Sequence, residues 1–303
     1  MSATTQQVSN AEQVRDRVHR MWGTVAASWG EHADEVEERA AVVTRTMIDA
    51  VGPVAGDEVL ELACGAGGLG LVIAEMVSPG GRVVLSDVAP EMVAIAADRA
   101  TRHGARHAAT AAVSSRVLDL EHLDLPDACF DIAVCREGLM FALDPTRAAT
   151  EIARVLRPGG RLALAVWGPR TRNPWLGVLL DTVQEHTGSP VPPAGIPGPF
   201  SLAGDGALAG ILTQAGFEEI QVQELAVPTH DASFDAYWRL RTELAGPFKG
   251  LLAALPDDQR TLIRETVHTR LSKYQTPAGL TIPGVSYLAS ARRPDRGETA
   301  FAD

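Results

Sequence analysis

The sequence predicts an α/β protein with a doubly wound, mostly parallel seven-stranded sheet and helical cap insertions. Two observations predict this class. Short apolar runs that end in polar residues alternate with segments of helical periodicity, and turns rich in glycine or proline separate them. Strands that alternate with helices in this way are typical of βαβ units, which form parallel sheets covered by helices on both faces.

The first predicted strand runs into a glycine-rich turn. Residues 59–62 form an apolar run interrupted by Glu61, and the turn at 63–68 precedes an apolar, helix-compatible segment. A strand, a tight turn and a helix in this order bring backbone N–H groups close to a bound nucleotide. The carboxylate of Glu61 would repel the pyrophosphate of NAD, whereas it would attract an ammonium or sulfonium group. The turn therefore favours a cationic nucleoside over a dinucleotide.

Polar side chains also follow the next three predicted strands, at residues 82–87, 115–118 and 130–135. Asp87, Asp119 and the pair Arg136-Glu137 lie at their ends. Open α/β sheets bind ligands at the carboxyl ends of their strands, and an acidic residue about 20 positions beyond the glycine turn commonly binds ribose. Asp87 has about this offset. Three more strands, at 161–167, 219–225 and 285–292, complete the predicted sheet.

Helical periodicity and the positions of proline and glycine place the helices. Two N-terminal helices are predicted, at 14–22 and 36–51, with the segment 22–29 between them. Pro90 and the pair Asp144-Pro145 start two core helices, because proline is tolerated in the first turn. The remaining predicted helices lie at 205–216, 233–245 and 257–274.

Five sequence blocks, in this order and spacing, resemble the class I S-adenosylmethionine-dependent methyltransferases, and among them the small-molecule group with the ubiquinone and menaquinone methyltransferases. The blocks are residues 61–67, 85–92, 118–120, 125–131 and 154–160. The resemblance implies a Rossmann-like fold, S-adenosyl-L-methionine as the cofactor, S-adenosyl-L-homocysteine as its product, and methyl transfer. It does not identify the acceptor.

The resemblance places the cofactor against residues near these strand ends: Glu61, Ala63, Gly65, Ala66, Gly67, Asp87, Val88, Met92, Asp119, Leu120 and Cys135. It implies that Glu61 attracts the methionyl ammonium group and that Asp87 accepts hydrogen bonds from both ribose hydroxyls. Asp119 is expected to accept a hydrogen bond from the adenine amino group, Met92 to lie along the adenine, and Cys135 to contribute its carbonyl group.

The acceptor side is predicted from position alone. Glu137 and His230 are the candidate catalytic residues, because each follows a strand and could serve as a general base. The predicted acceptor pocket comprises Trp29, Arg136, Met140, Tyr237 and Trp238. Two alternatives stay open: Arg136 could pair with an acid on the substrate or with Glu137, and the N-terminal tryptophans could be packing residues. Alignment of the acceptor with the methyl group is expected to carry most of the catalysis.

The chain is expected to divide into seven segments: a disordered tail (1–10), N-terminal helices that cover the cofactor site (11–52), the cofactor-binding core (53–168), a Pro/Gly-rich lid loop without regular structure (169–204), a core helix and strand (205–225), a helical cap for the acceptor (226–284), and the last core strand with a tail (285–303). A minimal methyltransferase of this class joins its last two strands by a short hairpin. The cap is therefore expected to select the acceptor.

Composition and charge argue against several other functions. The 303 residues carry a formal net charge of −11 without a Lys/Arg cluster, which disfavours nucleic acid as a partner. The three cysteines lack metal or disulfide spacing, and no apolar window is long enough for a membrane span, so a cytoplasmic protein is expected. His103 and His107 have the i, i+4 spacing of a metal pair but lack a nearby third ligand, so no metal is expected.

These expectations combine into methyl transfer to a small apolar or aromatic metabolite at oxygen, carbon or nitrogen, as in secondary-metabolite biosynthesis. A small-molecule acceptor is the expected partner, and a homodimer is compatible with the sequence. The main alternative is a non-methylating enzyme of the same fold that uses the cofactor as a scaffold, because its cofactor residues would look the same. A non-catalytic binding or regulatory protein would be expected to have a damaged cofactor turn, and the turn is intact.

Overall fold

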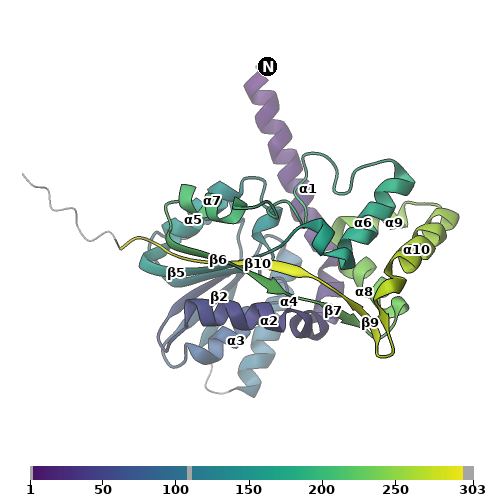
Figure 1. The fold of residues 1–303 in the computed structure, drawn as a ribbon. Helices are drawn as coiled ribbons and strands as arrows, with labels where there is room; N and C mark the ends of the chain where they lie inside the picture. The colour runs from purple at the N-terminus through teal and green to yellow at the C-terminus, as the bar shows by residue number, and fades with distance from the viewer. Residues whose placement is uncertain (1–2, 108–110, 296–303) are drawn as a thin grey trace, which may run out of the picture.

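The structure is a computed structural model that describes residues 3–107 and 111–295 (Figure 1). The strands of its main sheet are β1 Glu58–Leu62, β2 Arg82–Asp87, β3 Ala112–Val117, β4 Phe130–Arg136, β5 Leu156–Trp167, β6 Glu218–Ala226 and β10 Val285–Arg292. They lie in the order β3-β2-β1-β4-β5-β10-β6. β1 to β5 are parallel, and β10 is antiparallel to β5 and β6. This order confirms the predicted seven-stranded, mostly parallel α/β fold.

Helices cover both faces of the sheet. The core helices are α2 Ala33–Val51, α3 Gly68–Met76, α4 Pro90–Arg106, α5 Pro145–Val155 and α7 Ala207–Gln214. Figure 1 shows α2, α3 and α4 on one face, and α5 and α7 on the other. Both α4 and α5 begin at the predicted prolines, and Asp144 caps α5 by accepting a hydrogen bond of 2.9 Å from the backbone N–H of Arg147.

A helical insertion between β6 and β10 extends beyond one end of the main sheet (Figure 1). It contains β7 Thr229–Asp231, α8 Phe234–Leu244, α9 Gly246–Ala253, α10 Asp257–Leu271, η3 Ser272–Tyr274, β8 Gln275–Thr276 and β9 Gly279–Ile282. The predicted helices at 233–245 and 257–274 are confirmed as α8 and α10. Helix α9 and the small sheet of order β7-β9-β8 were not predicted, because these elements are too short for a clear periodic pattern.

The N-terminal segment differs from the expectation. Helix α1, Ala3–Glu31, is continuous, so residues 3–10 are helical rather than disordered. The two N-terminal helices are separated at His32 rather than within 22–29. Glycine within this helix allows close packing on α4: a Cβ atom at Gly30 would lie 3.2 Å from Cδ1 of Ile95. Neither α1 nor any other helix in the described part of the chain is long and apolar enough to cross a membrane.

The expected lid loop at 169–204 also contains regular structure. After η2 Arg170–Arg172, helix α6 spans Pro174–Thr187. Pro174 starts this helix where the sequence analysis treated it as part of an irregular segment, since proline fits the first helical turn. Leu176, Leu180 and Val183 are buried, and α6 packs against α10 of the insertion. The crowded prolines and glycines are confined to the chain after this helix.

Candidate active site

The carboxyl ends of the five parallel strands meet at a cavity of about 240 Å³. Its lining includes one residue at or just after the end of each strand: Ala63, Val88, Leu118, Glu137 and Trp167. Helices α1, α2, α6 and α8 line it too, through Trp22, Trp29, Arg39, Trp175 and Arg241. One cavity therefore joins the predicted cofactor positions to the helical insertion.

Glu61 lies buried beside the glycine-rich turn. Its Oε2 atom accepts a hydrogen bond of 2.8 Å from the backbone N–H of Gly70, at the start of α3. A Cβ atom at Gly70 would lie 2.5 Å from that oxygen, so this close approach requires glycine. Burial raises the pKa of Glu61 to about 8, although the nearby Arg136 acts in the opposite direction. A cation bound beside Glu61 would favour its ionised form.

Asp87 holds the same turn from the end of β2. Its two carboxylate oxygens accept hydrogen bonds of 3.0 Å from the backbone N–H groups of Gly65 and Ala89. Burial raises the pKa of Asp87, and these hydrogen bonds oppose the rise. Gly65 has a φ of +53°, which favours glycine, and a Cβ atom there would lie 3.5 Å from the Trp29 ring. The turn thus has a rigid carboxylate at its centre and an aromatic ring above it.

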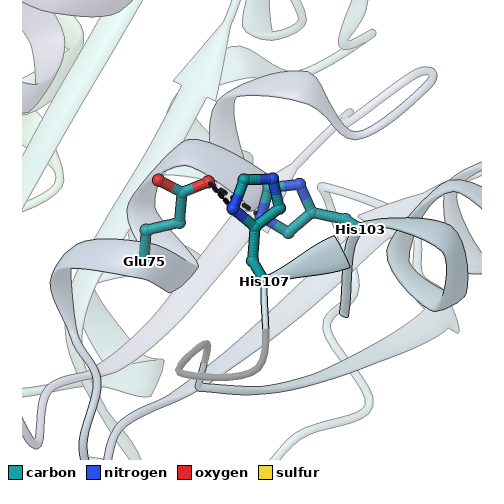
Figure 2. Close-up of side chains that lie close together, drawn as sticks. All are labelled: Glu75, His103 and His107. Atoms are coloured by element: carbon teal, nitrogen blue, oxygen red, sulfur yellow. Dashed lines mark ion pairs between the residues drawn. The ribbon is translucent and has the colours of Figure 1, made fainter. Parts of the chain in front are cut away.

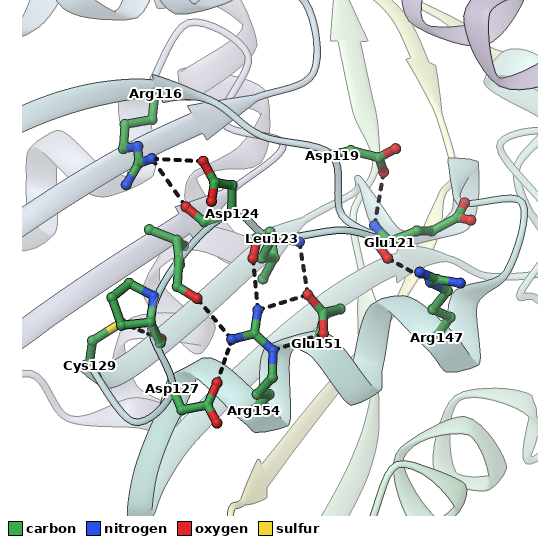
Figure 3. A network of polar contacts seen from close by, with 12 residues as sticks. Arg116, Asp119, Glu121, Leu123, Asp124, Asp127, Cys129, Arg147, Glu151 and Arg154 are labelled. Atoms are coloured by element: carbon green, nitrogen blue, oxygen red, sulfur yellow. Dashed lines mark hydrogen bonds and ion pairs between the residues drawn. The ribbon is translucent and has the colours of Figure 1, made fainter. Parts of the chain in front are cut away.

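Asp119 lies in the loop after β3, which a network of polar contacts holds in place (Figure 3). Its Oδ1 atom accepts a hydrogen bond of 2.9 Å from the backbone N–H of Glu121. The guanidinium group of Arg154 donates to the carbonyl oxygen of Leu123 at 2.7 Å. From α1, Nε of Arg15 lies 3.4 Å from Oδ2 of Asp119. Helix α1 therefore reaches the position predicted for the adenine.

Most of the predicted cofactor residues line the cavity: Glu61, Ala63, Gly65, Asp87, Val88, Met92, Asp119 and Leu120. Ala66, Gly67 and Cys135 are not in its lining. For Cys135 the reason is its position inside the sheet, where it pairs with Leu62 of β1 and Leu164 of β5. A carbonyl contact from Cys135 to a ligand therefore has no support in this structure.

Glu137 follows β4 and lines the cavity. It has a φ of +58°, and its Oε1 atom is buried without a hydrogen-bond partner among the described residues. Burial raises the pKa of Glu137 to about 7, while Arg136 and Arg39 oppose the rise. A strained backbone and an unsatisfied buried oxygen are common at functional sites.

Of the five residues predicted for the acceptor pocket, three line the cavity and two do not. Trp29, Arg136 and Met140 line the cavity, as predicted. The guanidinium group of Arg136 donates to both carboxylate oxygens of Glu37, at 2.6 and 2.8 Å, and to Oγ1 of Thr44. The sequence left open whether Arg136 pairs with the substrate or with Glu137. In the structure its charge is neutralised by Glu37 instead.

Tyr237, Trp238 and His230 lie outside the cavity lining, in contrast to the prediction. The ring of Tyr237 is fully buried, and its hydroxyl donates to the carbonyl oxygen of Trp175 at 2.7 Å. His230 is exposed on β7. The aromatic face of α8 packs into the protein interior, and Arg241, one turn beyond Tyr237, reaches the cavity in its place.

The cavity residues that the sequence did not predict include Arg39, Trp175 and Arg241. Arg39 looks like a solvated residue on the polar face of α2, and Trp175 lay in a segment expected to be irregular. Only the helical spacing of Arg241 from Tyr237 could have pointed to one of them.

The histidine pair on α4 has a third potential ligand, contrary to the expectation (Figure 2). Oε1 of Glu75, near the end of α3, lies 3.1 Å from Nε2 of His103 and 3.7 Å from Nδ1 of His107. The two imidazole rings stack with their centroids 4.5 Å apart. Sequence spacing could not find Glu75, because it comes from a different helix. None of the three side chains lines the cavity.

Comparisons with known proteins identify a methyltransferase domain in this chain. The methyltransferase domain family matches residues 60–164. Nocamycin O-methyltransferase from Saccharothrix syringae is 29% identical over 275 residues, which cover 84% of this chain and 92% of that protein. The ubiquinone/menaquinone biosynthesis C-methyltransferase UbiE from Hydrogenovibrio crunogenus is 37% identical over 118 residues, 39% of this chain and 45% of that protein.

Solved structures show the same fold. The [4+2]-cyclase SpnF has a TM-score of 0.51 at 24% identity, covering 84% of this chain and 81% of that chain. A phosphoethanolamine N-methyltransferase from Haemonchus contortus, solved with S-adenosylhomocysteine, has a TM-score of 0.50 at 18% identity, covering 83% and 52%. The chain thus has the class I methyltransferase fold and carries a methyltransferase domain. The chain belongs to the S-adenosylmethionine-dependent methyltransferases.

The raised pKa of Glu61 predicts a pH dependence of stability. Between about pH 4.5 and 8 the folded protein without cofactor holds a proton on Glu61 that the unfolded chain releases. The free energy of unfolding is therefore expected to fall as the pH rises through this window. In Glu61→Gln the fall should be less steep, by up to about 1.4 kcal/mol per pH unit.

Urea unfolding across this pH window measures the effect. Glu38→Gln, an exposed carboxyl on α2, is the control and should keep the wild-type slope. An equal slope in Glu61→Gln and the wild type would contradict the assigned protonation of Glu61.

Proposed function

We propose that this enzyme transfers the methyl group of S-adenosylmethionine to a small apolar or aromatic metabolite in secondary metabolism. The observation that carries the proposal is the single cavity with two unlike ends. Carboxylates and the glycine turn, with Trp29 above it, line one end, and the cavity also holds further aromatic rings: Trp22, Phe141, Trp167 and Trp175. The similarity to an enzyme named as an O-methyltransferase favours oxygen as the methylated atom over carbon or nitrogen.

The residues at the carboxylate end fit the cofactor. Glu61 would pair with its ammonium group, Asp87 would accept hydrogen bonds from its ribose hydroxyls, and Asp119 would bind its adenine amino group. When bound, the cofactor supplies an electrophilic methyl group on a sulfonium. The N-terminal helices would cover this end, a role supported by the contact of Arg15 with Asp119.

The rest of the cavity would orient the acceptor. An acceptor atom that is already ionised attacks the methyl carbon with its own lone pair, and no proton needs to move. Proximity and alignment then account for most of the rate. The insertion would select the acceptor, since Arg241 and Leu244 of α8 line the cavity.

The alternative is a reaction without methyl transfer that uses the cofactor as a scaffold. The shared fold with a [4+2]-cyclase is compatible with it, because a fold does not determine the reaction. The experiment that separates the two is a screen of acceptors with S-adenosylmethionine, in which S-adenosylhomocysteine and methylated product are measured together by mass spectrometry. Equal amounts of both products support methyl transfer. Conversion of a substrate without S-adenosylhomocysteine would establish the alternative.

A variant at Glu137 tests whether the acceptor needs a general base. We expect Glu137→Gln to keep kcat within about tenfold of the wild type at neutral pH, because an ionised acceptor needs no base. Loss of a required base would instead cost about 10²–10⁴ in rate. The measurement is a pH–rate profile with the acceptor from the screen, with S-adenosylhomocysteine affinity as the control. A kcat that falls below about pH 7 in the wild type, but not in Glu137→Gln, would make Glu137 the base.

A further inference from the structure

The acceptor end of the cavity holds more positive than negative charge. Arg136 is neutralised by Glu37, and Nη2 of Arg241 pairs with Oδ2 of Asp231 at 3.0 Å. Arg39 also lines the cavity, and within residues 3–107 and 111–295 no carboxylate forms an ion pair with it. Three arginines thus meet at this end, and two of them have a carboxylate partner.

The charge of Arg39 lies in a poorly hydrated place. Burial, followed by the neighbouring Arg241, lowers the pKa of Arg39 to about 10, although Glu137 and Asp231 oppose this. The pKa of Glu137 is raised to about 7, so at neutral pH its carboxyl is only partly ionised. Arg39 is half-buried, and an unpaired charge that is partly removed from water is costly, so proteins normally pair such groups. Arg39 therefore has no counter-ion among the described side chains.

The ring of Trp175 contacts the other two arginines of the cavity, Arg39 and Arg241. The Cζ atoms of Arg39 and Arg241 lie 5.7 and 5.4 Å from the centroid of the Trp175 ring. Nε1 of Trp175 donates to Oδ1 of the buried Asn173 at 3.0 Å, and its carbonyl oxygen accepts from Tyr237. Asn173 thus fixes the ring of Trp175 and Tyr237 fixes its backbone, so cation–π contact keeps the guanidinium groups in place before any ligand binds.

We propose that the acceptor is an organic acid that binds as an anion, with its ionised oxygen atoms paired with Arg39 beside Trp175. This inference rests on the proposed function and adds the substrate class. The planar guanidinium group matches a carboxylate through two parallel hydrogen bonds. Arg241 adds a second guanidinium group, whose Nε and Nη1 atoms are buried without a hydrogen-bond partner among the described residues. Its charge is neutralised by Asp231, whereas Arg39 has no carboxylate partner among these residues, so the ion pair is assigned to Arg39. The neighbouring tryptophans would hold the apolar body of the acid.

The test compares organic acids with neutral analogues of the same shape. Benzoate, 2-naphthoate and decanoate, and the primary amide of each, are titrated into protein loaded with S-adenosylhomocysteine. At least one acid is expected to bind about tenfold or more tighter than its amide, as charge-assisted pairing predicts. Arg39→Met should reduce this ratio to near one while S-adenosylhomocysteine affinity stays within about threefold. Arg45→Met, an exposed arginine on the same helix, is the matched control. Arg39→Gln replaces Arg39→Met if the methionine variant does not fold.

Two results would overturn the inference: acid-to-amide ratios near one for every pair in the wild type, including the case where no acid binds, or an acid preference that persists without Arg39. Either result, with intact cofactor binding and methyl transfer to a neutral acceptor, leaves the proposed function standing. Failure of the wild type to bind S-adenosylhomocysteine would instead overturn the proposed function, whatever the acids do.

Discussion

Asp87→Ala is expected to weaken the binding of S-adenosylhomocysteine by at least about tenfold. Two effects add. The variant loses charge-assisted hydrogen bonds to the ribose, each of about 1.5–3 kcal/mol. It also releases the N–H groups of Gly65 and Ala89, which Asp87 holds at 3.0 Å, so the glycine turn loses its fixed shape. Isothermal titration calorimetry with the purified variant measures the affinity directly.

The control for this prediction is Asp124→Ala, which removes an exposed carboxylate from the loop that follows β3. It should bind S-adenosylhomocysteine as the wild type does. Asp87→Asn separates the two effects, because the amide can still accept a hydrogen bond but carries no charge. Equal affinity for Asp87→Ala and the wild type would remove Asp87 from the cofactor site.

Tyr237→Ala is expected to lower the free energy of unfolding by about 3–5 kcal/mol, as truncation of a large buried aromatic side chain generally does. Tyr237 is among the largest fully buried side chains, and its ring packs on Phe234 with centroids 5.8 Å apart. The expectation from sequence was a direct role in acceptor binding. The structure indicates a positioning role, because the hydroxyl of Tyr237 holds the backbone of Trp175. Urea unfolding gives the size of the loss.

Tyr237→Phe is the matched variant, since it keeps the ring and removes one hydrogen bond. It should cost about 1 kcal/mol. If Tyr237 positions Trp175, Tyr237→Phe should also raise the KM of an acid acceptor while leaving S-adenosylhomocysteine affinity unchanged. A Tyr237→Ala protein as stable as the wild type would show that the ring is not the core residue described here.

The fold could be predicted because its signals are local. Apolar runs such as residues 59–62 and 130–135, and the prolines that start α4 and α5, act on their own neighbours in the chain. The predictions for α1 and α6 were wrong because these helices depend on contacts that are not local. Helix α1 packs its glycines Gly23 and Gly30 against α4, and helix α6 packs against α10 of the insertion. Both contacts are distant in sequence.

The sequence by itself determined the α/β sheet, the family and the strand-end residues that line the cavity, since each parallel strand brings its last residues to the same edge. Tertiary structure alone decided which helix residues meet in that cavity. Arg39, Trp175 and Arg241 come from α2, α6 and α8, and each looks unremarkable in its own segment. Their meeting in one cavity, and the burial that raises the pKa of Glu137, depend on how distant elements pack. Burial belongs to the assembled fold, and no stretch of sequence encodes it locally.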